Sequence, residues 1–442
     1  MNVVEPAIEF CDYSGLRKIE LIGKVCTKQE DSIKPDSAET FCRNRLIDGH
    51  TAIFEHEYVY FNVTSIPNRV VREFVKLSPY IRWSYLGNYI GFSYRVFLDI
   101  MSNSRKMKAI YNDIYHPSEV NDLFYNMLLL SKEFSHLLFD DEDITAKLEY
   151  GIDASLRIAS DAEILANAPE IYNVTYKITT DRGVTHEAVR HREMSFMQES
   201  TRWCNYAKGR LGYKYGKNIS VIEPPFKNED SLEKFYDVIA GNEAIYQELT
   251  NDGEPAQLAR SVLPTATKSD IYVSGTLDMW IGEHLETVYP KLTIVENKGF
   301  LPLRNHKAAH PQMIEIAKMI AEDIAVRFPN ETGCIINYFE YTTMANNNYI
   351  SRSKFQEIFA KALSKCNVPQ DEQDKFFEEG SILQLRNLGI CIAITNIIDN
   401  IIKEELPDYD GCVSGETFNT IYEYNKKYMY EREQERKREE NA

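Results

Sequence analysis

The chain has 442 residues, of which 43% are hydrophobic and 26% charged, so it can form two or three folded domains with apolar cores. Its formal net charge of −17 argues against broad nucleic-acid binding and against binding to an anionic membrane surface, while leaving room for a local basic pocket. The 8 cysteines form no CxxC pair, which favours a reducing compartment over a disulfide framework or a zinc ribbon.

The N-terminal residues lack the basic start and apolar core of a signal peptide, so we expect a cytoplasmic protein, in a bacterium or in the host cell of a virus. The longest apolar run, residues 388–402, is interrupted by polar residues and is too short to span a bilayer. We therefore expect no membrane association.

The first 64 residues have the pattern of an α/β segment. Asp36 or Ser37 is a suitable N-cap for a helix, and Gly49 is a suitable end for it. We expect a strand over 3–13, a helix over 36–50 and a second strand over 56–64.

The character of the chain changes over residues 65–170. Residues 80–100 predict a hairpin that turns at Gly87-Asn88 and runs into a helix. Residues 117–139 begin with Pro117 and Ser118 and have the periodicity of a helix. This part is therefore predicted to combine a hairpin with helices.

Strand-like alternation returns over residues 171–183, and we expect a helix to begin just after Gly183. Beyond about residue 330 the chain is poor in glycine and is predicted to be helical. The further helices that we expect are 231–250, 254–263 (ended by Pro264), 310–328, 353–366, 381–405 and the highly charged 417–442.

Positive charge gathers in one part of this acidic chain. Four arginines, Arg182, Arg190, Arg192 and Arg202, lie within 21 residues. No GxxxxGK[ST], GxGxxG, GxSxG or HExxH motif occurs, so a bound phosphate must be held by arginines and backbone amides. Ser200 and Thr201 add hydroxyl groups beside Arg202, a set of donors that suits a phosphate. Spacing alone equally allows a solvated helix face with surface arginines.

Two other groups of residues deserve a chemical interpretation. The segment HTAIFEH at 50–56 places two histidines beside Glu55, but no third convergent ligand is evident, so we predict a structural or ligand-contacting role and no metal. Cys204 lies next to the arginines, yet no base is spaced to activate it. We therefore expect a small buried cysteine and no nucleophile.

Arg190-His191-Arg192, followed by seven residues and Ser200, resembles the signature of the flavin-dependent thymidylate synthases, the ThyX family. Three more segments resemble the family in the right order, and four ordered motifs are far more specific than one. They are GHTAIFEH at 49–56, ARSVLP at 259–264 and LRNHKAAHPQMIEIA at 303–317. The resemblance covers 1–64 and 171–328, which makes 65–170 an insertion and 329–442 a helical C-terminal extension.

The resemblance implies an α/β (α+β) fold of the ThyX type, with a central mixed sheet flanked by helices, assembled as a homotetramer with shared active sites. It implies conversion of dUMP to dTMP, with methylenetetrahydrofolate as the carbon donor, NADPH as the reductant and FAD as the cofactor. Neither a metal nor an enzyme nucleophile is needed. A fixed guanidinium in a dry pocket would stabilise negative charge on the uracil ring.

The resemblance also implies roles for single residues. Arg190 would contact dUMP, while His191 and Arg192 would hold the flavin, and His50 and Glu55 would line the flavin site. The implied catalytic residues are Arg190, Ser200 and Arg304. The implied dUMP contacts are Glu187, Arg190, Gln198, Glu199, Ser200, Thr201, Arg202, Arg260 and Arg304, with Ser200, Arg202 and Arg260 at the phosphate.

One segment, 276–302, departs from the family pattern. Thr276, Asp278 and Gly282 stand where the family tends to have Asn, Arg and Asn or His, and extra residues precede Leu303-Arg304. Two alternatives therefore stay open beside thymidylate synthesis. One is a related flavoenzyme that makes another C5 modification of dUMP, such as hydroxymethylation, and the other is a flavin- or nucleotide-binding protein without turnover.

Overall fold

A computed structural model describes residues 1–84, 87–103, 119–139, 156–281, 299–305, 308–328, 334–337, 352–379, 382–385, 397–398 and 400–405. The chain divides into two compact units, Met1–Asp278 and Met279–Ala442. This boundary falls within 171–328, which we expected to be one domain. The predicted helix 417–442, the predicted helix start at Pro117 and Ser118, and Gly282 lie outside the described residues.

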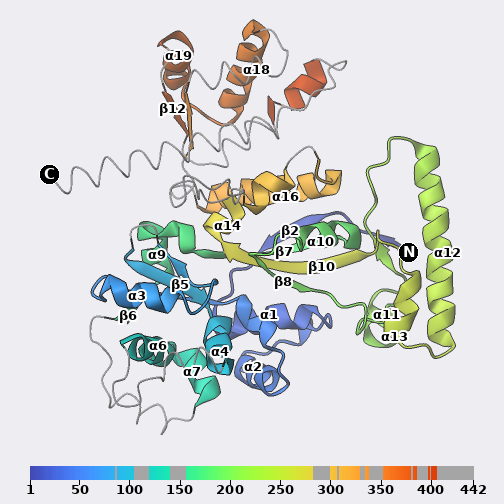
Figure 1. Ribbon diagram of the computed structural model, residues 1–442. Helices are drawn as coiled ribbons and strands as arrows, with labels where there is room; N and C mark the ends of the chain where they lie inside the picture. The colour runs from blue at the N-terminus through green and yellow to red at the C-terminus, as the bar shows by residue number, and fades with distance from the viewer. Residues whose placement is uncertain are drawn as a thin grey trace. The chain divides into compact units, whose positions relative to one another are not determined.

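The first unit is built around a four-stranded antiparallel sheet with the order β2-β7-β10-β8 (Figure 1). The strands are β2 (Ala7–Phe10), β7 (Asn173–Asp181), β10 (Lys268–Thr276) and β8 (Ser195–Gln198). β7 confirms the predicted alternation. We did not predict β10, because its polar residues are buried with its apolar ones and no polar face marks it as a strand.

Helices cover both faces of this sheet. On one face α1 (Gly15–Val25), which we did not predict, packs Ile22 and Val25 against Tyr272 of β10. On the other face lies α10 (Arg182–Ala188), which contacts β7 and β10 (Figure 1). The carboxylate of Asp181 caps α10 by accepting the N–H of Val184 at 2.7 Å. The predicted helix after β7 therefore exists and begins at residue 182.

The predicted helix over 36–50 is confirmed as α2 (Ala38–Ile47). Gly49 follows it with a φ of +73°, a left-handed conformation that favours glycine after a helix. Ser37 precedes α2 but does not cap it, because its hydroxyl instead donates to the Glu20 carboxylate at 2.8 Å. A short 3₁₀ helix, η2 (Thr51–Glu55), then leads into β3 (Tyr58–Asn62), which confirms the second predicted strand.

A second antiparallel sheet, with the order β4-β5-β3-β6, joins β3 to strands from residues 65–170. These strands are β4 (Arg82–Trp83), β5 (Tyr89–Ser93) and β6 (Arg157–Ile158). The predicted hairpin is confirmed: Gly87 has a φ of +77°, and its carbonyl accepts the Trp83 indole N–H at 2.9 Å. β5 runs directly into α4 (Tyr94–Ser102), as expected.

Residues 65–170 share a hydrophobic core with residues 1–64. Phe54 of η2 lies 5.7 Å from Phe134, between ring centroids, and both side chains are fully buried. The same core includes Phe97 and Phe124. The other helices of this part are α3 (Asn68–Val75), α6 (Glu119–Leu130), α7 (Lys132–Leu138) and α9 (Asp161–Asn167), with 3₁₀ helices η1 (Glu30–Ser32) and η3 (Pro169–Ile171) nearby.

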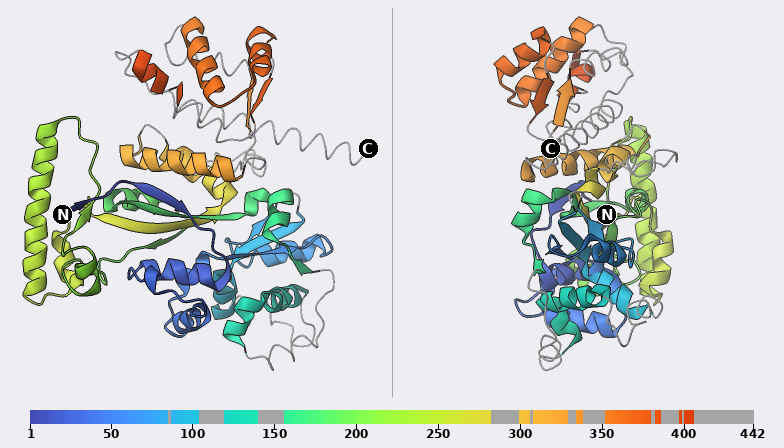
Figure 2. Two further views of the ribbon diagram at one scale, coloured as in Figure 1. Left: turned by 180° about the vertical axis from the view of Figure 1, so that it is seen from behind. Right: turned by 60° about the vertical axis from the view of Figure 1, so that its left-hand side comes forward.

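The remainder of the first unit gathers around a smaller core that contains Tyr206, Ile219 and Tyr246. Its longest element, α12 (Glu229–Asn251), confirms the helix predicted over 231–250 and stands out in Figure 2. The other elements are α11 (Gly209–Lys214), α13 (Ala256–Ala259), η4 (Arg260–Val262) and the parallel pair of β1 (Asn2–Val3) with β9 (Ser220–Val221). The α+β class is thus confirmed, and the four-stranded sheet that carries the signature is antiparallel throughout.

In the second unit, α16 (Pro311–Arg327) confirms the helix predicted over 310–328 and has Pro311 in its first turn. The predicted helix 381–405 is wrong at its start, because residues 382–385 form β12 (Ile382–Leu385), which pairs antiparallel with β11 (Cys334–Asn337). The other helices are α14 (Leu277–Ile281), which crosses the boundary, α15 (Phe300–Arg304), α18 (Arg352–Lys365) and α19 (Gln370–Glu379). Within the described ranges, every helix is too short or too polar to cross a membrane.

Candidate functional site

The arginine-rich signature is a turn followed by a strand. Residues 189–194 leave α10 in turns and bends, β8 follows at 195–198, and the chain turns again at 201–203. The alternative of a solvated helix face is therefore wrong. Arg190, Arg192 and Arg202 are exposed, and within the described part of the chain their guanidinium groups form no ion pair.

The two motifs that were expected to share the phosphate lie side by side. Ser200, Thr201 and Arg202 follow β8, and the Arg260 guanidinium approaches the Thr201 hydroxyl at 3.5 Å. The Ser200 hydroxyl accepts the N–H of Arg202 at 3.4 Å, and the Ser200 N–H donates to the carbonyl of Cys26 at 3.0 Å. The backbone of this turn is thus fixed, while Arg202 and Arg260 stay exposed.

Gln198 and Glu199 point to opposite faces of the sheet, as successive residues of an extended chain do. The Gln198 amide donates to the hydroxyls of Thr185 at 2.8 Å and Ser269 at 2.9 Å, on the face covered by α10. Glu199 points to the face covered by α1. These two bonds use the amide nitrogen of Gln198. The side-chain carbonyl oxygen is the group that they leave for the predicted contact with the nucleotide.

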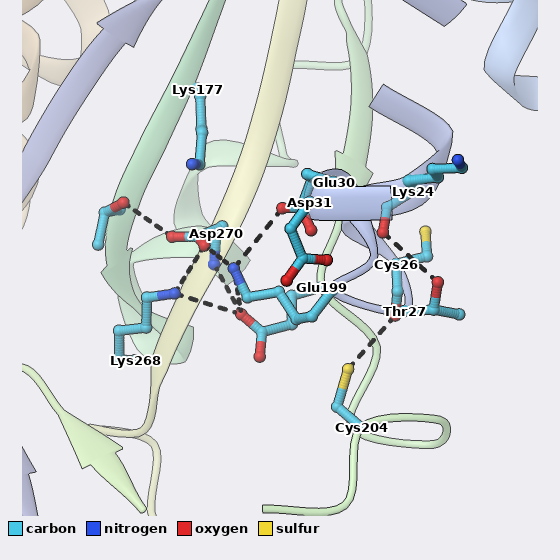
Figure 3. Close-up of polar contacts among 12 residues, drawn as sticks. Lys24, Cys26, Thr27, Glu30, Asp31, Lys177, Glu199, Cys204, Lys268 and Asp270 are labelled. Atoms are coloured by element: carbon cyan, nitrogen blue, oxygen red, sulfur yellow. Dashed lines mark hydrogen bonds and ion pairs between the residues drawn. The ribbon is translucent and has the colours of Figure 1, made fainter. Parts of the chain in front are cut away.

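Glu199 belongs to a buried cluster of four charged residues, which we call the Glu199 cluster: Lys28, Glu199, Lys268 and Asp270. Its carboxylate lies 3.6 Å from the Lys28 Nζ and 3.5 Å from the Lys268 Nζ. Asp270 binds both ammonium groups, that of Lys268 at 2.7 Å. Figure 3 shows Lys268, Asp270 and Glu199 pointing toward one another. Two lysines thus balance two carboxylates that are 1% and 5% exposed.

Neutral groups complete the hydrogen bonding of the Glu199 cluster. The Tyr206 hydroxyl donates to Glu199 at 2.6 Å, and the Thr179 hydroxyl donates to Asp270 at 2.7 Å. Burial alone would raise the pKa of Asp270, but the charges of Lys268 and Lys28 outweigh it and hold that pKa well below its usual range. The Asp270 carboxylate is therefore ionised at neutral pH.

The polar groups of Glu199 are bonded within the protein. The Glu199 carboxylate is taken up within the cluster, its N–H donates to the carbonyl of Asp270 at 2.8 Å, and its carbonyl accepts from Arg182 at 3.3 Å. Glu199 thus holds the start of the turn that presents Ser200 and Arg202, and its predicted contact with dUMP stays a prediction.

The predicted flavin segment lies against the other end of β8. Glu55, at the end of η2, lies close enough to the side chain of Ser195 for this hydroxyl to oppose the rise in the Glu55 pKa that burial causes. The next residue, His56, bonds through Nδ1 to the Ser274 hydroxyl at 2.7 Å, and Ser274 faces Ser195 across the β8–β10 pair. Burial lowers the pKa of His56 to about 3, so this histidine is neutral. His50 is exposed at the start of η2, apart from this contact.

The remaining predicted site residues differ in how far they are buried and in which unit they lie. Glu187 is half-buried on α10, and His191 is buried just after it. Arg304 ends α15 in the second unit, where its guanidinium lies 5.9 Å from the centroid of the Phe300 ring. In the departing segment, the Thr276 hydroxyl donates to the buried carboxylate of Asp278.

The expected buried state of Cys204 is confirmed. Its side chain is fully buried, and burial raises the pKa of its thiol to about 12, with the charge of Glu199 adding to the effect. The thiol approaches the carbonyl of Cys26 at 3.5 Å. A thiol with such a pKa is almost entirely protonated at neutral pH and is a poor nucleophile.

Sequence reasoning missed three members of the Glu199 cluster. Lys28, Lys268 and Asp270 are far from the signature in the chain. Lys268 and Asp270 meet it because β10 pairs with β8, and Lys28 reaches it from the turn after α1. The available signal was the charged pair Lys268 and Asp270 just ahead of the apolar IYV run, which is unusual in a central strand.

Comparisons with known proteins match the part of the chain that contains the signature. Residues 166–330 match the family model described as thymidylate synthase complementing protein. A flavin-dependent thymidylate synthase of Corynebacterium efficiens is 27% identical over 195 residues, 40% of this chain and 66% of that protein. One of Pyrococcus furiosus is 27% identical over 146 residues, 33% of this chain and 51% of that protein.

A solved structure, a UMP/dUMP methylase PolB from Streptomyces cacaoi bound with 5-Br dUMP, is 12% identical over 74% of this chain and 93% of that chain. Its TM-score of 0.27 is too low to support an argument. Over residues 166–330 this chain is similar to the thymidylate synthase complementing proteins, which confirms the resemblance drawn from the motifs in that range. The chain spans about half to two thirds of the length of these curated relatives.

Proposed function

We propose that this protein is a flavin-dependent thymidylate synthase, which converts dUMP to dTMP with methylenetetrahydrofolate as the carbon donor and NADPH as the reductant. The observation that carries the proposal is the exposed guanidinium groups of Arg190, Arg192 and Arg202, which lack ion pairs within the described residues of a chain with a net charge of −17. Such cations are available to bind an anion, and they lie within the segment that matches the family.

The dUMP phosphate is bound at the turn after β8. Arg202 and Arg260 supply positive charge, and Ser200 and Thr201 supply hydroxyls next to them. Guanidinium groups suit a phosphate because their planar donors match two of its oxygens at once. The Glu199 cluster fixes the backbone of the turn, so little ordering is left for the moment of binding.

The flavin is held on the other side of the signature. Arg192 supplies an exposed charge for its anionic part, His191 and Glu55 line the site, and His50 lies at the exposed start of η2. These donors fit an anionic cofactor that also carries hydrogen-bonding ring atoms. When bound, FAD carries the reducing equivalents that the reaction needs.

The uracil ring lies between these two sites. Arg190 stabilises the negative charge that develops on the ring as carbon is added at C5, and Arg304 and Glu187 contact the same ring. Such a guanidinium stabilises charge most strongly where water is excluded. We expect a homotetramer in which neighbouring subunits share each site, which would bring groups of the second unit to the nucleotide.

A second candidate is a flavoenzyme that makes another C5 modification of dUMP, such as hydroxymethylation. The observation that favours it is the buried hydrogen bond of Thr276 with Asp278, which places a carboxylate where the family tends to carry a cation or an amide. A changed environment for the flavin would alter the fate of the one-carbon unit.

Mass analysis of the product formed from dUMP, NADPH and methylenetetrahydrofolate with FAD distinguishes these functions. Our proposal predicts dTMP. A hydroxymethylated nucleotide would support the second candidate, and nucleotide binding without any product would leave a binding protein without turnover. The matched control is the Ser200→Ala protein, which should form the same product at a lower rate at subsaturating dUMP.

A further inference from the structure

Residues 65–170, which we expected to be an insertion, are built into the candidate site. Their strands β4, β5 and β6 extend the sheet of β3, and their helix α4 packs against η2, the segment that carries Glu55. The shared core of Phe54 with Phe97 and Phe134 fixes this arrangement. The placement of Glu55 thus depends on a part of the chain that the motifs do not include.

Arg95, on α4, makes the most direct contact. Its Nη1 donates to the Thr51 hydroxyl at the start of η2, and its Nε binds Asp99 on its own helix at 2.7 Å. The side chain is 28% exposed, so its charge is only partly screened by water. Arg95 therefore holds the start of η2 through Thr51, and the side chain of Ser195 on β8 acts on the Glu55 carboxylate at the other end of η2.

The charges around Glu55 are consistent with this arrangement. Burial raises the pKa of Glu55, Arg95 and the side chain of Ser195 oppose that rise, and Asp99 adds to it. Arg95 thus favours the ionised form of a carboxylate that burial would otherwise tend to protonate.

A second arginine of the same part of the chain approaches the signature from β4. The Arg82 guanidinium lies 3.5 Å from the carboxylate of Glu193, which directly follows Arg192. The positive charge of Arg82 also opposes the rise that burial causes in the pKa of Tyr58. Residues 65–170 thus place positive charge beside both η2 and the signature.

We propose that residues 65–170 are a working part of the flavin site, and that Arg95 is the positioning residue through which they orient Glu55. The inference rests on the proposed function in one respect, since it takes Glu55 to contact the flavin. Arg95 touches no ligand itself: it fixes η2 through Thr51 and keeps the Glu55 carboxylate charged and directed toward Ser195.

The test measures FAD affinity by fluorescence quenching in the full-length protein and in the Arg95→Ala, Arg95→Lys, Glu55→Gln and Arg95→Ala/Glu55→Gln variants. We expect Arg95→Ala to weaken FAD binding on the order of tenfold, the size of one hydrogen bond to a charged group. Arg95→Lys should recover part of the loss, because it restores the charge. In the Glu55→Gln background the Arg95→Ala change should cost less than about threefold, because two residues that act together are not additive.

The matched control is Arg157→Ala, which removes another arginine of the same part of the chain. Arg157 pairs with Glu163 at 2.6 Å and, within the described residues, forms no hydrogen bond or ion pair with η2 or the signature. This variant should bind FAD as the unmodified protein does. Equal losses in Arg157→Ala and Arg95→Ala would mean that both only loosen the fold, and would overturn the proposal, as would wild-type FAD affinity in Arg95→Ala or full additivity with Glu55→Gln.

Hydrogen exchange of the free protein separates this proposal from the proposed function. Arg95→Ala should speed amide exchange at residues 51–56, while Arg157→Ala should not. If the unmodified protein binds no FAD, the proposed function fails, and the exchange measurement still decides whether Arg95 holds η2. Unchanged exchange at residues 51–56 in Arg95→Ala would overturn the positioning role in either case.

Discussion

Two groups of charged residues meet at the signature, and they differ in burial and in pairing. The Glu199 cluster is buried, and each of its charges has an opposite partner within the protein. Arg190, Arg192 and Arg202 are exposed and lack ion pairs within the described part of the chain. Buried charges that are paired hold a structure in place, whereas exposed charges of one sign attract a ligand.

The comparison shows how an acidic chain can bind anions. Most carboxylates of the chain lie outside the signature. Within the signature the fully buried carboxylate is that of Glu199, and Lys28 and Lys268 neutralise its charge. The positive field of the exposed arginines is therefore not cancelled by Glu199. The four predictions that follow, and the closing measurement, test this division from the largest expected effect to the smallest.

Lys28→Met should have the largest effect on stability. It leaves Glu199 and Asp270 with a single ammonium group between them, and an uncompensated buried charge costs about 3–5 kcal/mol. The measurement is the free energy of unfolding in urea. Lys214→Met is the control, since Lys214 is an exposed lysine 3.8 Å from Asp31. Equal destabilisation by both changes would contradict the assigned role of the cluster.

Acid should lower the free energy of unfolding through the Glu199 cluster. The pKa of Asp270 is held below its unfolded value, so the stability that Asp270 contributes is fully present above about pH 4, the ordinary aspartate pKa, and is lost as pH falls further. The free energy of unfolding should therefore fall below about pH 4, and fall less steeply in Asp270→Asn. Parallel pH profiles for the two proteins would show that Asp270 is not a source of acid sensitivity.

Arg192→Ala should weaken FAD binding by about 1–3 kcal/mol, the range for a hydrogen bond to a charged group. Because the side chain is exposed and lacks an ion pair within the described residues, the free energy of unfolding should change by less than about 0.5 kcal/mol. Flavin absorbance after gel filtration and urea denaturation give the two values. A protein that keeps its flavin would remove Arg192 from the cofactor site.

Cys204→Ala should have the smallest effect on turnover. The thiol is buried with a pKa of about 12, so it supplies no nucleophile, and the rate should stay within about twofold of the original. The removal of a buried sulfur should lower the free energy of unfolding by about 1 kcal/mol. Loss of turnover in a protein that remains folded would assign Cys204 a chemical role.

The sequence predicted the helices α2, α12 and α16, and for α2 the signals were the polar residues before its start and Gly49 after its end. It did not predict β10, since the buried Ser269, Asp270 and Ser274 of that strand hide its pattern. The motifs located the exposed arginines, because residue type and spacing alone define a cation-rich segment. They could not reveal Lys28 or Arg95, whose roles arise from the pairing of β8 with β10 and the packing of α4 on η2.

We assign the buried, paired charges to stability and the exposed arginines to ligand binding. Arg202→Ala tests this assignment most directly, with dUMP affinity and the free energy of unfolding determined on the same protein. The account predicts dUMP binding weaker by about 1–3 kcal/mol and an unfolding free energy within about 0.5 kcal/mol of the original. Unchanged dUMP affinity, or a loss of stability as large as that of Lys28→Met, would contradict the assignment of the exposed arginines to ligand binding.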